Sequence, residues 1–377
     1  MMQVMKKVCC LRQTRRILTI RKLAVGISLT AVIILIVVLR HPGLEIKKNS
    51  FDRKETFILT KIDNQQIKKD AFEKWDLLLF SYMRSGSSVT SHTLRDAKAG
   101  LFYWHEPLNP IAPNEFFRYN KKCMFRSPFC NVSEPSNSEI VNQVEHIYKC
   151  RTERLFPAII EKTIKLNKSG WTVCTDPDHK CTSLLNALCM KAAHRVTKIL
   201  RIGLDIGLTL MERMPKLKIV YLVRDPRGVL FSRIMTPWFP VFENDTETLI
   251  NNIVTHCDKM RTDLLKLKEI EYLYPDRIMT IYFEELAEDH FKAMKKIYNF
   301  INLTYHIVDK VNMDKKFVNM RESNHKWRWS MNWIHVHWVD ELCSDTYSRL
   351  GYEIIPSEEA LRNMSVKSWV RPLNQRI

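Results

Sequence analysis

WDLLLFSYMRSGSSVTSHTL, residues 75–94, runs from an apolar strand through a short Gly/Ser turn into a polar helix. Backbone N–H groups in such a turn converge with the positive end of the helix that follows, and this arrangement binds phosphate or sulfate. Ser87, Ser88 and Thr90 add hydroxyl groups, and Arg84 adds a cation. The stretch therefore predicts an anion-binding loop at the carboxyl end of a strand.

The same stretch weakens the hypothesis of a nucleotide-dependent kinase. The loop that binds nucleoside triphosphates reads G-x-x-x-x-G-K-[ST], and its Lys-Ser/Thr pair contacts phosphate and magnesium. Neither the second glycine nor that pair is present in residues 75–94. A lumenal kinase is kept only as an alternative.

A second strand-to-loop junction lies well downstream, where residues 217–233 read LKIVYLVRDPRGVLFSR. Arg224 and Ser232 stand on the two sides of this positively charged turn, and both are candidates for binding a second anionic group. A structural salt bridge from Arg224 to Asp225 or another acidic residue is the alternative for the arginine. A plain hydroxyl on a helix surface is the alternative for the serine.

RSGSS at 84–88 and LVRDPRGVLFSR at 222–233 together resemble the two cosubstrate-binding segments of Golgi carbohydrate sulfotransferases. The closest resemblance is to the group that sulfates the 6-hydroxyl of GlcNAc, Gal or GalNAc with 3′-phosphoadenosine 5′-phosphosulfate (PAPS). The resemblance spans about residues 74–352. Four further stretches share it: FYWHEPL at 102–108, PDRIMTIYFEELAED at 275–289, KKIYNFINL at 295–303 and ELCSDTYSRLGY at 341–352.

This resemblance implies a P-loop-like α/β fold with a central parallel sheet flanked by helices, with PAPS as cosubstrate and no metal. It also implies that Arg224 and Ser232 bind the 3′-phosphate of PAPS. The first segment would hold the 5′-phosphosulfate, and its arginine would also act in catalysis. The residues of that first segment are Arg84, Ser85, Gly86, Ser87 and Ser88.

Glu106 is the candidate catalytic base. It lies in the polar break His105-Glu106-Pro107 after the apolar run 101–104, and the related enzymes have an acidic residue in the same element. A carboxyl group with an ordinary pKa of about 4.3 is ionised near neutrality and can accept a proton. His105 is the rival base, and a salt bridge that orders the loop is the alternative role for Glu106.

The N-terminal part of the chain predicts a membrane anchor. Residues 23–39, LAVGISLTAVIILIVVL, carry no charge and reach the lower limit for a membrane-spanning helix. The charged residues before them are all basic, which holds the N-terminus in the cytosol: Lys6, Lys7, Arg12, Arg15, Arg16, Arg21 and Lys22. We expect a type II Golgi membrane protein with a cytosolic tail (1–22), a signal anchor (23–39), a stem (40–69) and a lumenal sulfotransferase domain (70–377). A cleaved signal peptide is the alternative.

Cysteines and glycosylation acceptors beyond the anchor agree with an oxidising lumen. An even number of cysteines there indicates disulfides, although the sequence leaves their pairing open. The eight are Cys123, Cys130, Cys150, Cys174, Cys181, Cys189, Cys257 and Cys343. The Asn-x-Ser/Thr acceptors are Asn131, Asn167, Asn244, Asn302 and Asn363. A zinc site is the alternative for Cys174, His179, Cys181 and Cys189, but their spacing matches no standard ligand pattern.

Strands that alternate with helices predict a parallel sheet whose carboxyl edge gathers the ligand-binding loops. Both proposed binding segments are strand-to-loop junctions, so they can face one crevice. The expected strands are 77–80, 196–202, 218–223 and 277–283, and the expected helices are 182–195 and 256–268. Residues 109–138, rich in Pro, Asn and Ser, predict a long surface loop that helps to shape an acceptor cleft.

Charge indicates anionic ligands, because the formal net charge is +18. Nucleic acid would also be attracted, but a lumenal domain does not meet it. The expected partners are PAPS, a glycan or glycosaminoglycan acceptor and, through the anchor, the membrane; a homo-oligomer is left open. A catalytically silent glycan-binding type II protein is the remaining alternative.

Four tryptophans are candidates either for stacking on sugar rings or for core packing: Trp327, Trp329, Trp333 and Trp338.

Overall fold

The computed structural model describes residues 74–95, 100–111, 135–166, 179–303 and 308–372. All of them belong to one compact unit, Gln66–Ile377. The expected tail, anchor and stem lie outside the described ranges, as does most of the expected loop at 109–138. Among the helices in those ranges, none combines the length and apolarity needed to cross a bilayer. The anchor at 23–39 stays a prediction.

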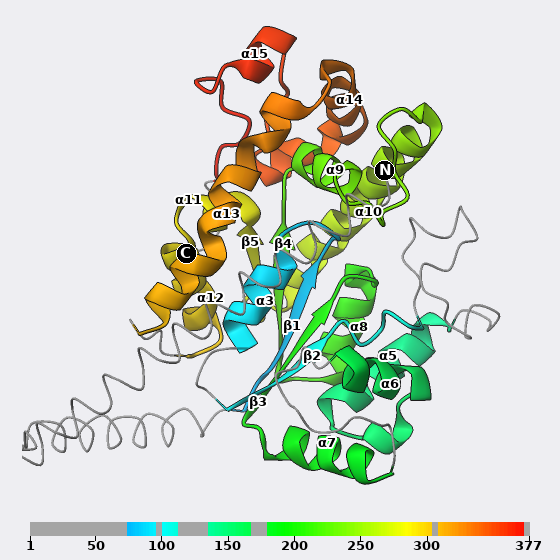
Figure 1. Ribbon diagram of the computed structural model, residues 1–377. Helices are drawn as coiled ribbons and strands as arrows, with labels where there is room; N and C mark the ends of the chain where they lie inside the picture. The colour runs from blue at the N-terminus through cyan, green and yellow to red at the C-terminus, as the bar shows by residue number, and fades with distance from the viewer. Residues whose placement is uncertain (1–73, 96–99, 112–134, 167–178, 304–307, 373–377) are drawn as a thin grey trace, which may run out of the picture. The chain divides into compact units, whose positions relative to one another are not determined.

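Five parallel strands form the central sheet, in the order β2-β3-β1-β4-β5 (Figure 1). Because all strands run the same way, their carboxyl ends meet at one edge, where parallel sheets bind ligands. The arrangement confirms the predicted α/β fold with a central parallel sheet flanked by helices. The strands are β1 (Asp76–Ser81), β2 (Leu101–His105), β3 (His194–Ile199), β4 (Leu217–Val223) and β5 (Ile278–Tyr282).

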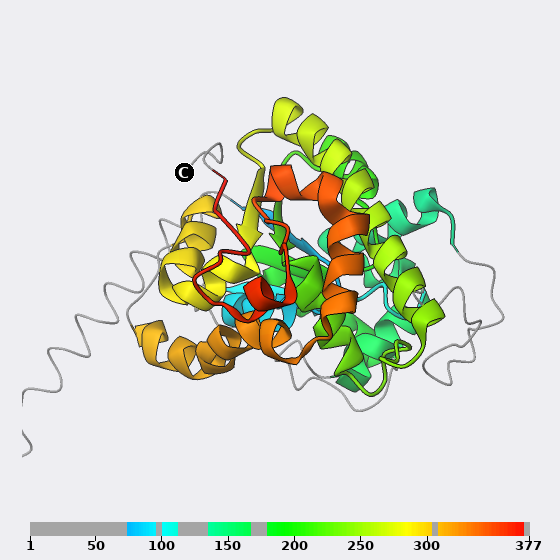
Figure 2. The same cartoon turned by 90° about the horizontal axis from the view of Figure 1, so that it is seen from above.

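Helices connect the strands and cover the sheet. They are α3 (Ser87–Arg95), α5 (Asn137–Tyr148), the 3₁₀ turn η2 (Thr152–Arg154), α6 (Pro157–Leu166), α7 (His179–Lys191), α8 (Leu204–Arg213), α9 (Pro226–Ile234), α10 (Thr246–Leu273), α11 (Phe283–Glu288), α12 (His290–Phe300), α13 (Val308–Ser330), α14 (Trp333–Leu350) and α15 (Glu358–Arg362). Figure 2 shows α12 and α13, in yellow and orange, on one side of the sheet and α10, in lime, on the other.

Strand β1 is buried on both faces of the sheet. Leu78 and Phe80 belong to an apolar cluster that includes residues of α8, α10 and α14. Leu77 and Leu79 belong to a second cluster that includes residues of α12 and α13. Successive side chains of a strand point to opposite faces, so an unbroken apolar run fits a strand with helices on both sides.

The boundary between α7 and β3 differs from the prediction. The helix expected at 182–195 ends at Lys191, and the strand expected at 196–202 begins at His194. The His194 ring stacks on Trp75 with 4.0 Å between ring centroids, and Arg195 forms an ion pair with Asp76 at 3.5 Å. These contacts with the neighbouring segment favour the strand over the helix.

Other elements confirm or extend the sequence prediction. The strands expected at 77–80, 218–223 and 277–283 are confirmed as β1, β4 and β5, and the helix expected at 256–268 is the middle of the longer α10. Residues 101–105 form β2, a strand that was not predicted.

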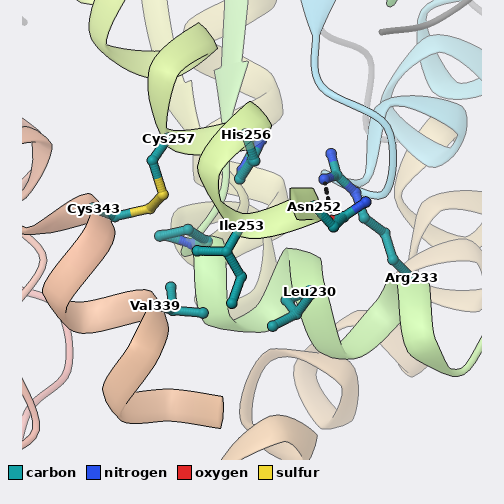
Figure 3. A pocket seen from close by; sticks show the side chains of 9 residues that line it. Leu230, Arg233, Asn252, Ile253, His256, Cys257, Val339 and Cys343 are labelled. Atoms are coloured by element: carbon teal, nitrogen blue, oxygen red, sulfur yellow. Dashed lines mark hydrogen bonds between the residues drawn. A yellow bond between two sulfur atoms is a disulfide. The ribbon is translucent and has the colours of Figure 1, made fainter. Parts of the chain in front are cut away.

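Two disulfides within the described ranges confirm the prediction that cysteines of this part of the chain form disulfides. Cys150 pairs with Cys189, and Cys257 of α10 pairs with Cys343 of α14 (Figure 3). The first pair corrects the zinc alternative, because Cys189 is bonded to sulfur and is not free to bind a metal. The side chains of the other four cysteines of the expected lumenal domain lie outside the described part of the chain.

Candidate active site

The predicted anion-binding loop follows β1, and α3 begins at Ser87. Arg84 and Gly86 both have a positive φ, 77° and 87°. A Cβ at Gly86 would lie 2.6 Å from Cδ2 of Phe283. Only glycine therefore fits this position, because any side chain would collide with the aromatic ring beneath the turn.

Ser85 provides a direct test of whether this loop fits an anionic group. Its side chain is fully buried, and within the described ranges its Oγ has no hydrogen-bond partner. A buried hydroxyl without a partner is costly, and its O–H can donate to an oxygen of a phosphosulfate. The loop therefore fits the 5′-phosphosulfate group of PAPS.

Lys198 joins the loop to the candidate base, and the sequence analysis missed it. Its Nζ donates to Ser88 Oγ at 3.0 Å and to Glu106 Oε1 at 2.7 Å. The lysine is 1% exposed and lies near the carboxyl end of β3, which is between β1 and β2 in the sheet. The signal available in the sequence was a lysine within the strand expected at 196–202.

Glu106 is held as an ionised carboxylate. Burial favours its neutral form, but the ion pair with Lys198 outweighs burial and lowers the pKa of Glu106 to about 2. The residue has a positive φ of 46°, and its backbone N–H donates to Lys198 O at 3.0 Å. Lys162 donates to the Glu106 carbonyl at 3.0 Å. The carboxylate can thus accept a proton, but with less driving force than an unpaired one.

His105, the rival base, adjoins Glu106 at the end of β2. Its Nδ1 lies 2.9 Å from the Tyr103 hydroxyl, which also donates to Ser91 Oγ at 2.9 Å. Its Nε2 lies 3.8 Å from Glu106 Oε1. Both candidates therefore occupy the same edge of the sheet, and the choice between them stays a prediction.

The second predicted segment meets the first. Arg84 donates from Nε to Ser232 Oγ at 3.0 Å, and Arg224 donates to the Arg84 carbonyl at 2.9 Å. Arg224 also donates to the Ser323 carbonyl of α13 at 2.9 Å, and its guanidinium stacks over Phe283 at 4.0 Å. The predicted 5′ and 3′ phosphate sites are therefore adjacent.

Asp225 is not the ion-pair partner of Arg224, although the charges of Glu284 and Asp225 both favour the charged form of Arg224. Asp225 pairs instead with Arg227 at 2.9 Å, and Arg227 also pairs with Asp340 at 3.0 Å. Arg224 is 5% exposed, and burial lowers its pKa to about 10. It remains a cation near neutrality, and a phosphate would offset the cost of its burial.

The four tryptophans considered for sugar binding do not share one role. Trp327 is 1% exposed, and Arg227 lies over its ring at 4.7 Å. Trp333 and Trp338 are partly buried against the core, whereas Trp329 is 56% exposed. Core packing therefore accounts for three of the four.

A small internal cavity near Arg233 is separate from these groups. It is lined by residues of α9, α10 and α14 beside the Cys257–Cys343 disulfide, including Leu230, Asn252 and Val339 (Figure 3). Arg233 donates to Asn252 Oδ1 at 2.9 Å across one side of it. Side chains fill it so closely that no room for a water molecule remains. It is part of the core and not a binding site.

Comparisons with known proteins agree with this geometry. A family model described as the sulfotransferase domain matches residues 74–337. Carbohydrate sulfotransferase 1 of Homo sapiens is 27% identical over 355 residues, which cover 78% of this chain and 83% of that protein. Carbohydrate sulfotransferase 3 of Mus musculus is 22% identical over 344 residues, which cover 77% and 70%. Carbohydrate sulfotransferase 1 of Danio rerio is 23% identical over 287 residues, which cover 69% of this chain and 62% of that protein. The chain therefore spans less than two thirds of the length of that relative.

Solved structures show a more distant similarity. The mouse sulfotransferase SULT7A1 complexed with PAP aligns with a TM-score of 0.42 and 12% identity, covering 77% of this chain and 89% of that one. The sulfotransferase domain from the curacin biosynthetic pathway aligns with a TM-score of 0.44 and 14% identity, covering 75% and 99%.

Proposed function

Because this chain belongs to the sulfotransferase domain family, we propose that it transfers the sulfuryl group of PAPS to a carbohydrate hydroxyl, the 6-hydroxyl of GlcNAc, Gal or GalNAc. The observation that carries the proposal is the contact between Arg84 and Ser232, which brings the two predicted cosubstrate-binding segments together. The resemblance of the sequence to the 6-O-sulfotransferase group supports the choice of hydroxyl.

The residues divide the work between binding and chemistry. PAPS supplies the sulfuryl group and a phosphate leaving group. The backbone N–H groups of the turn, the Ser85 hydroxyl and Arg84 hold the 5′-phosphosulfate, and Arg224 with Ser232 holds the 3′-phosphate. Cationic groups fixed at this edge stabilise the negative charge that develops on the leaving phosphate.

The Glu106 carboxylate, which contacts Lys198, accepts the proton of the acceptor hydroxyl. Glu106 is ionised across the physiological pH range, so it is always in the form that can accept the hydroxyl proton. Lys198 orients it and at the same time contacts Ser88 in the phosphosulfate loop. The ion pair thus sets the position of the base relative to the bound cosubstrate.

We further propose that the protein is a single-pass type II Golgi membrane protein with its catalytic domain in the lumen. The basic N-terminus followed by the apolar run 23–39 supports this topology. The Cys150–Cys189 and Cys257–Cys343 disulfides support an oxidising compartment.

Incubation of the purified protein with ³⁵S-labelled PAPS and a panel of desulfated keratan, desulfated chondroitin and GlcNAc-terminated glycans tests the proposal. We expect label in at least one glycan without added magnesium. Glycan binding without transfer would identify a silent binding protein, and magnesium-dependent transfer of phosphate from ATP would identify a kinase.

A further inference from the structure

Residues 235–247, which comprise the connection between α9 and α10 and the first two residues of α10, present large apolar side chains to solvent. Met235 is 64% exposed, Trp238 is 51% exposed and Phe242 is 60% exposed. Several large apolar side chains left in water within one short segment are a common mark of a binding surface. The proposed transfer reaction assigns no role to these side chains.

The backbone holds these side chains in place. Thr236 Oγ1 donates to the Ser232 carbonyl at 2.6 Å, and the backbone N–H of Phe239 donates to the Thr236 carbonyl at 2.9 Å. Phe239 and Val241 are buried, at 1% and 3% exposure, and anchor the segment between its exposed residues. Trp238 and Phe242 are thus presented on a fixed backbone, so little conformational entropy is lost when a ligand binds.

The segment follows directly on a residue of the candidate active site. Met235 follows Ser232 by three residues at the end of α9, so the two side chains lie on the same face of that helix. Ser232 in turn contacts Arg84 of the phosphosulfate loop. Figure 1 shows α9 and the start of α10 beyond the carboxyl ends of the strands, where the candidate active site lies.

Charge narrows the class of ligand. Residues 235–247 read MTPWFPVFENDTE, with three acidic residues and no Lys or Arg, in a chain whose formal net charge is +18. Glu243 and Glu247 are exposed, whereas Asp245 accepts a hydrogen bond from Thr248 N and caps α10. An acidic polymer would be repelled here, and an uncharged ligand would not.

We propose that Trp238 and Phe242 form a stacking platform for a sugar ring of the acceptor, and that Glu243 and Glu247 select an uncharged hexose or hexosamine over a glycosaminoglycan that contains uronic acid. The aromatic faces pack against the apolar C–H face of the ring. The carboxylates accept hydrogen bonds from its hydroxyls. This inference rests on the proposed sulfuryl transfer and names the acceptor class for the same site.

Steady-state kinetics of the full chain with two acceptors tests the platform. One is a neutral Gal/GlcNAc oligosaccharide, and the other is desulfated chondroitin, which carries glucuronate. Trp238→Ala should raise the KM for the neutral acceptor about tenfold while leaving the Kd for 3′,5′-bisphosphoadenosine unchanged. Trp238→Phe should restore most of the loss. Tyr272→Ala, which removes an aromatic ring that is 85% exposed on α10, is the matched control and should change nothing.

A double substitution tests the proposed selection against charged acceptors. Glu243→Gln combined with Glu247→Gln should lower the KM for desulfated chondroitin and leave nucleotide affinity as it was. If the KM for desulfated chondroitin is unchanged in this double variant, the proposed selection by charge is overturned. An unchanged KM for the neutral acceptor in Trp238→Ala, or an equal effect of Tyr272→Ala, would overturn the platform.

Saturation-transfer NMR with the neutral oligosaccharide separates this inference from the proposed function, because binding needs no turnover. Transfer from protein to sugar that is lost in Trp238→Ala supports the platform even if no acceptor is sulfated. A change in molecular mass caused by Trp238→Ala would instead identify a second copy of the chain as the occupant. Binding seen only in Asn244→Gln would identify an N-linked sugar of the chain itself, and either result would overturn the proposal.

Discussion

The Arg84 guanidinium donates a hydrogen bond to the Ser232 hydroxyl at 3.0 Å, across 148 residues of sequence. The Arg84 carbonyl accepts a second hydrogen bond from Arg224, at 2.9 Å. Phe283 lies under both segments, because it contacts the Gly86 position and stacks with Arg224. The distance between the two predicted phosphate sites is therefore set by direct contacts and not by the loops alone.

Gly86→Ala should disrupt nucleotide binding more than Gly100→Ala. Both positions have a positive φ, so each alanine carries backbone strain of about 1–3 kcal/mol. A Cβ at Gly86 would also meet Phe283 at 2.6 Å, whereas a Cβ at Gly100 would have its nearest neighbour, Ala193 Cβ, at 3.9 Å. Calorimetric titration with 3′,5′-bisphosphoadenosine should show at least tenfold weaker binding only in Gly86→Ala. Equal affinities would mean that the turn does not contact the nucleotide.

Arg224→Ala should weaken binding of PAPS and of the product 3′,5′-bisphosphate by roughly 1.5–3 kcal/mol, because a charge-assisted hydrogen bond to the 3′-phosphate is lost. Adenosine 5′-phosphosulfate, which lacks that phosphate, should be affected much less. Ser232→Ala should show the same pattern more mildly. Arg224 also holds the Arg84 and Ser323 carbonyls, so equal weakening for all three nucleotides would assign it a purely structural role.

Glu106→Gln should lower the rate of transfer by roughly 10² to 10⁴ while nucleotide affinity stays nearly normal, since the amide cannot accept the proton. Single-turnover assays and nucleotide titration on the same preparation measure the two quantities. Near-normal turnover would remove Glu106 from the chemistry and favour His105.

Lys198→Met should make the reaction sensitive to acid. The pKa of Glu106 is lowered to about 2, so its ion pair contributes stability above the ordinary carboxyl range near pH 4.3, and that stability is lost as the pH falls toward 2. The wild type should therefore show no loss of kcat/KM from Glu106 between pH 5 and 8. Without Lys198, burial raises the pKa of Glu106, and an acid limb should move up into the measured range. Lys162→Met, which removes the hydrogen bond to the Glu106 carbonyl and a weaker charge interaction with the Glu106 carboxylate, is the comparison and should move the acid limb less. An acid limb of the wild type that disappears in His105→Gln would instead assign proton acceptance to the histidine.

Replacing Cys257 and Cys343 together by serine should lower the free energy of unfolding by roughly 2–4 kcal/mol, because the disulfide closes a long loop in the unfolded chain. The two cysteines are 86 residues apart and join α10 to α14. Denaturant unfolding with and without the substitutions measures the change. The pair lies in the core beside Arg233 and contacts neither predicted phosphate site, so nucleotide affinity at low temperature should be retained (Figure 3). An unchanged midpoint would mean that the disulfide does not constrain the unfolded state.

Local chemistry in the sequence was enough to predict the strand, turn and helix at 75–94 and the second junction at 217–233. In the first segment a glycine between serines follows an apolar run, and in the second an arginine follows an apolar run. Each of these patterns involves only a few consecutive residues, so it can be recognised without the structure. The apolar run of β1 is buried on both faces of the sheet. Continuous apolar runs of this kind are typical of strands in parallel sheets, which is why the sequence predicted such a sheet. The resemblance to sulfotransferases rests on the same short stretches.

Only the tertiary structure brought Lys198, Phe283 and Ser323 to these segments. Each lies on an element that is distant in sequence from the two segments, and sheet order and helix packing decide what it touches. The strand at 101–105, the start of β3 at His194 and the pairing of Cys150 with Cys189 depend on contacts of the same kind. Local patterns determine which elements form and which turns can bind anions, whereas contacts between distant residues decide which side chains complete the site, because those contacts form only when the elements pack together.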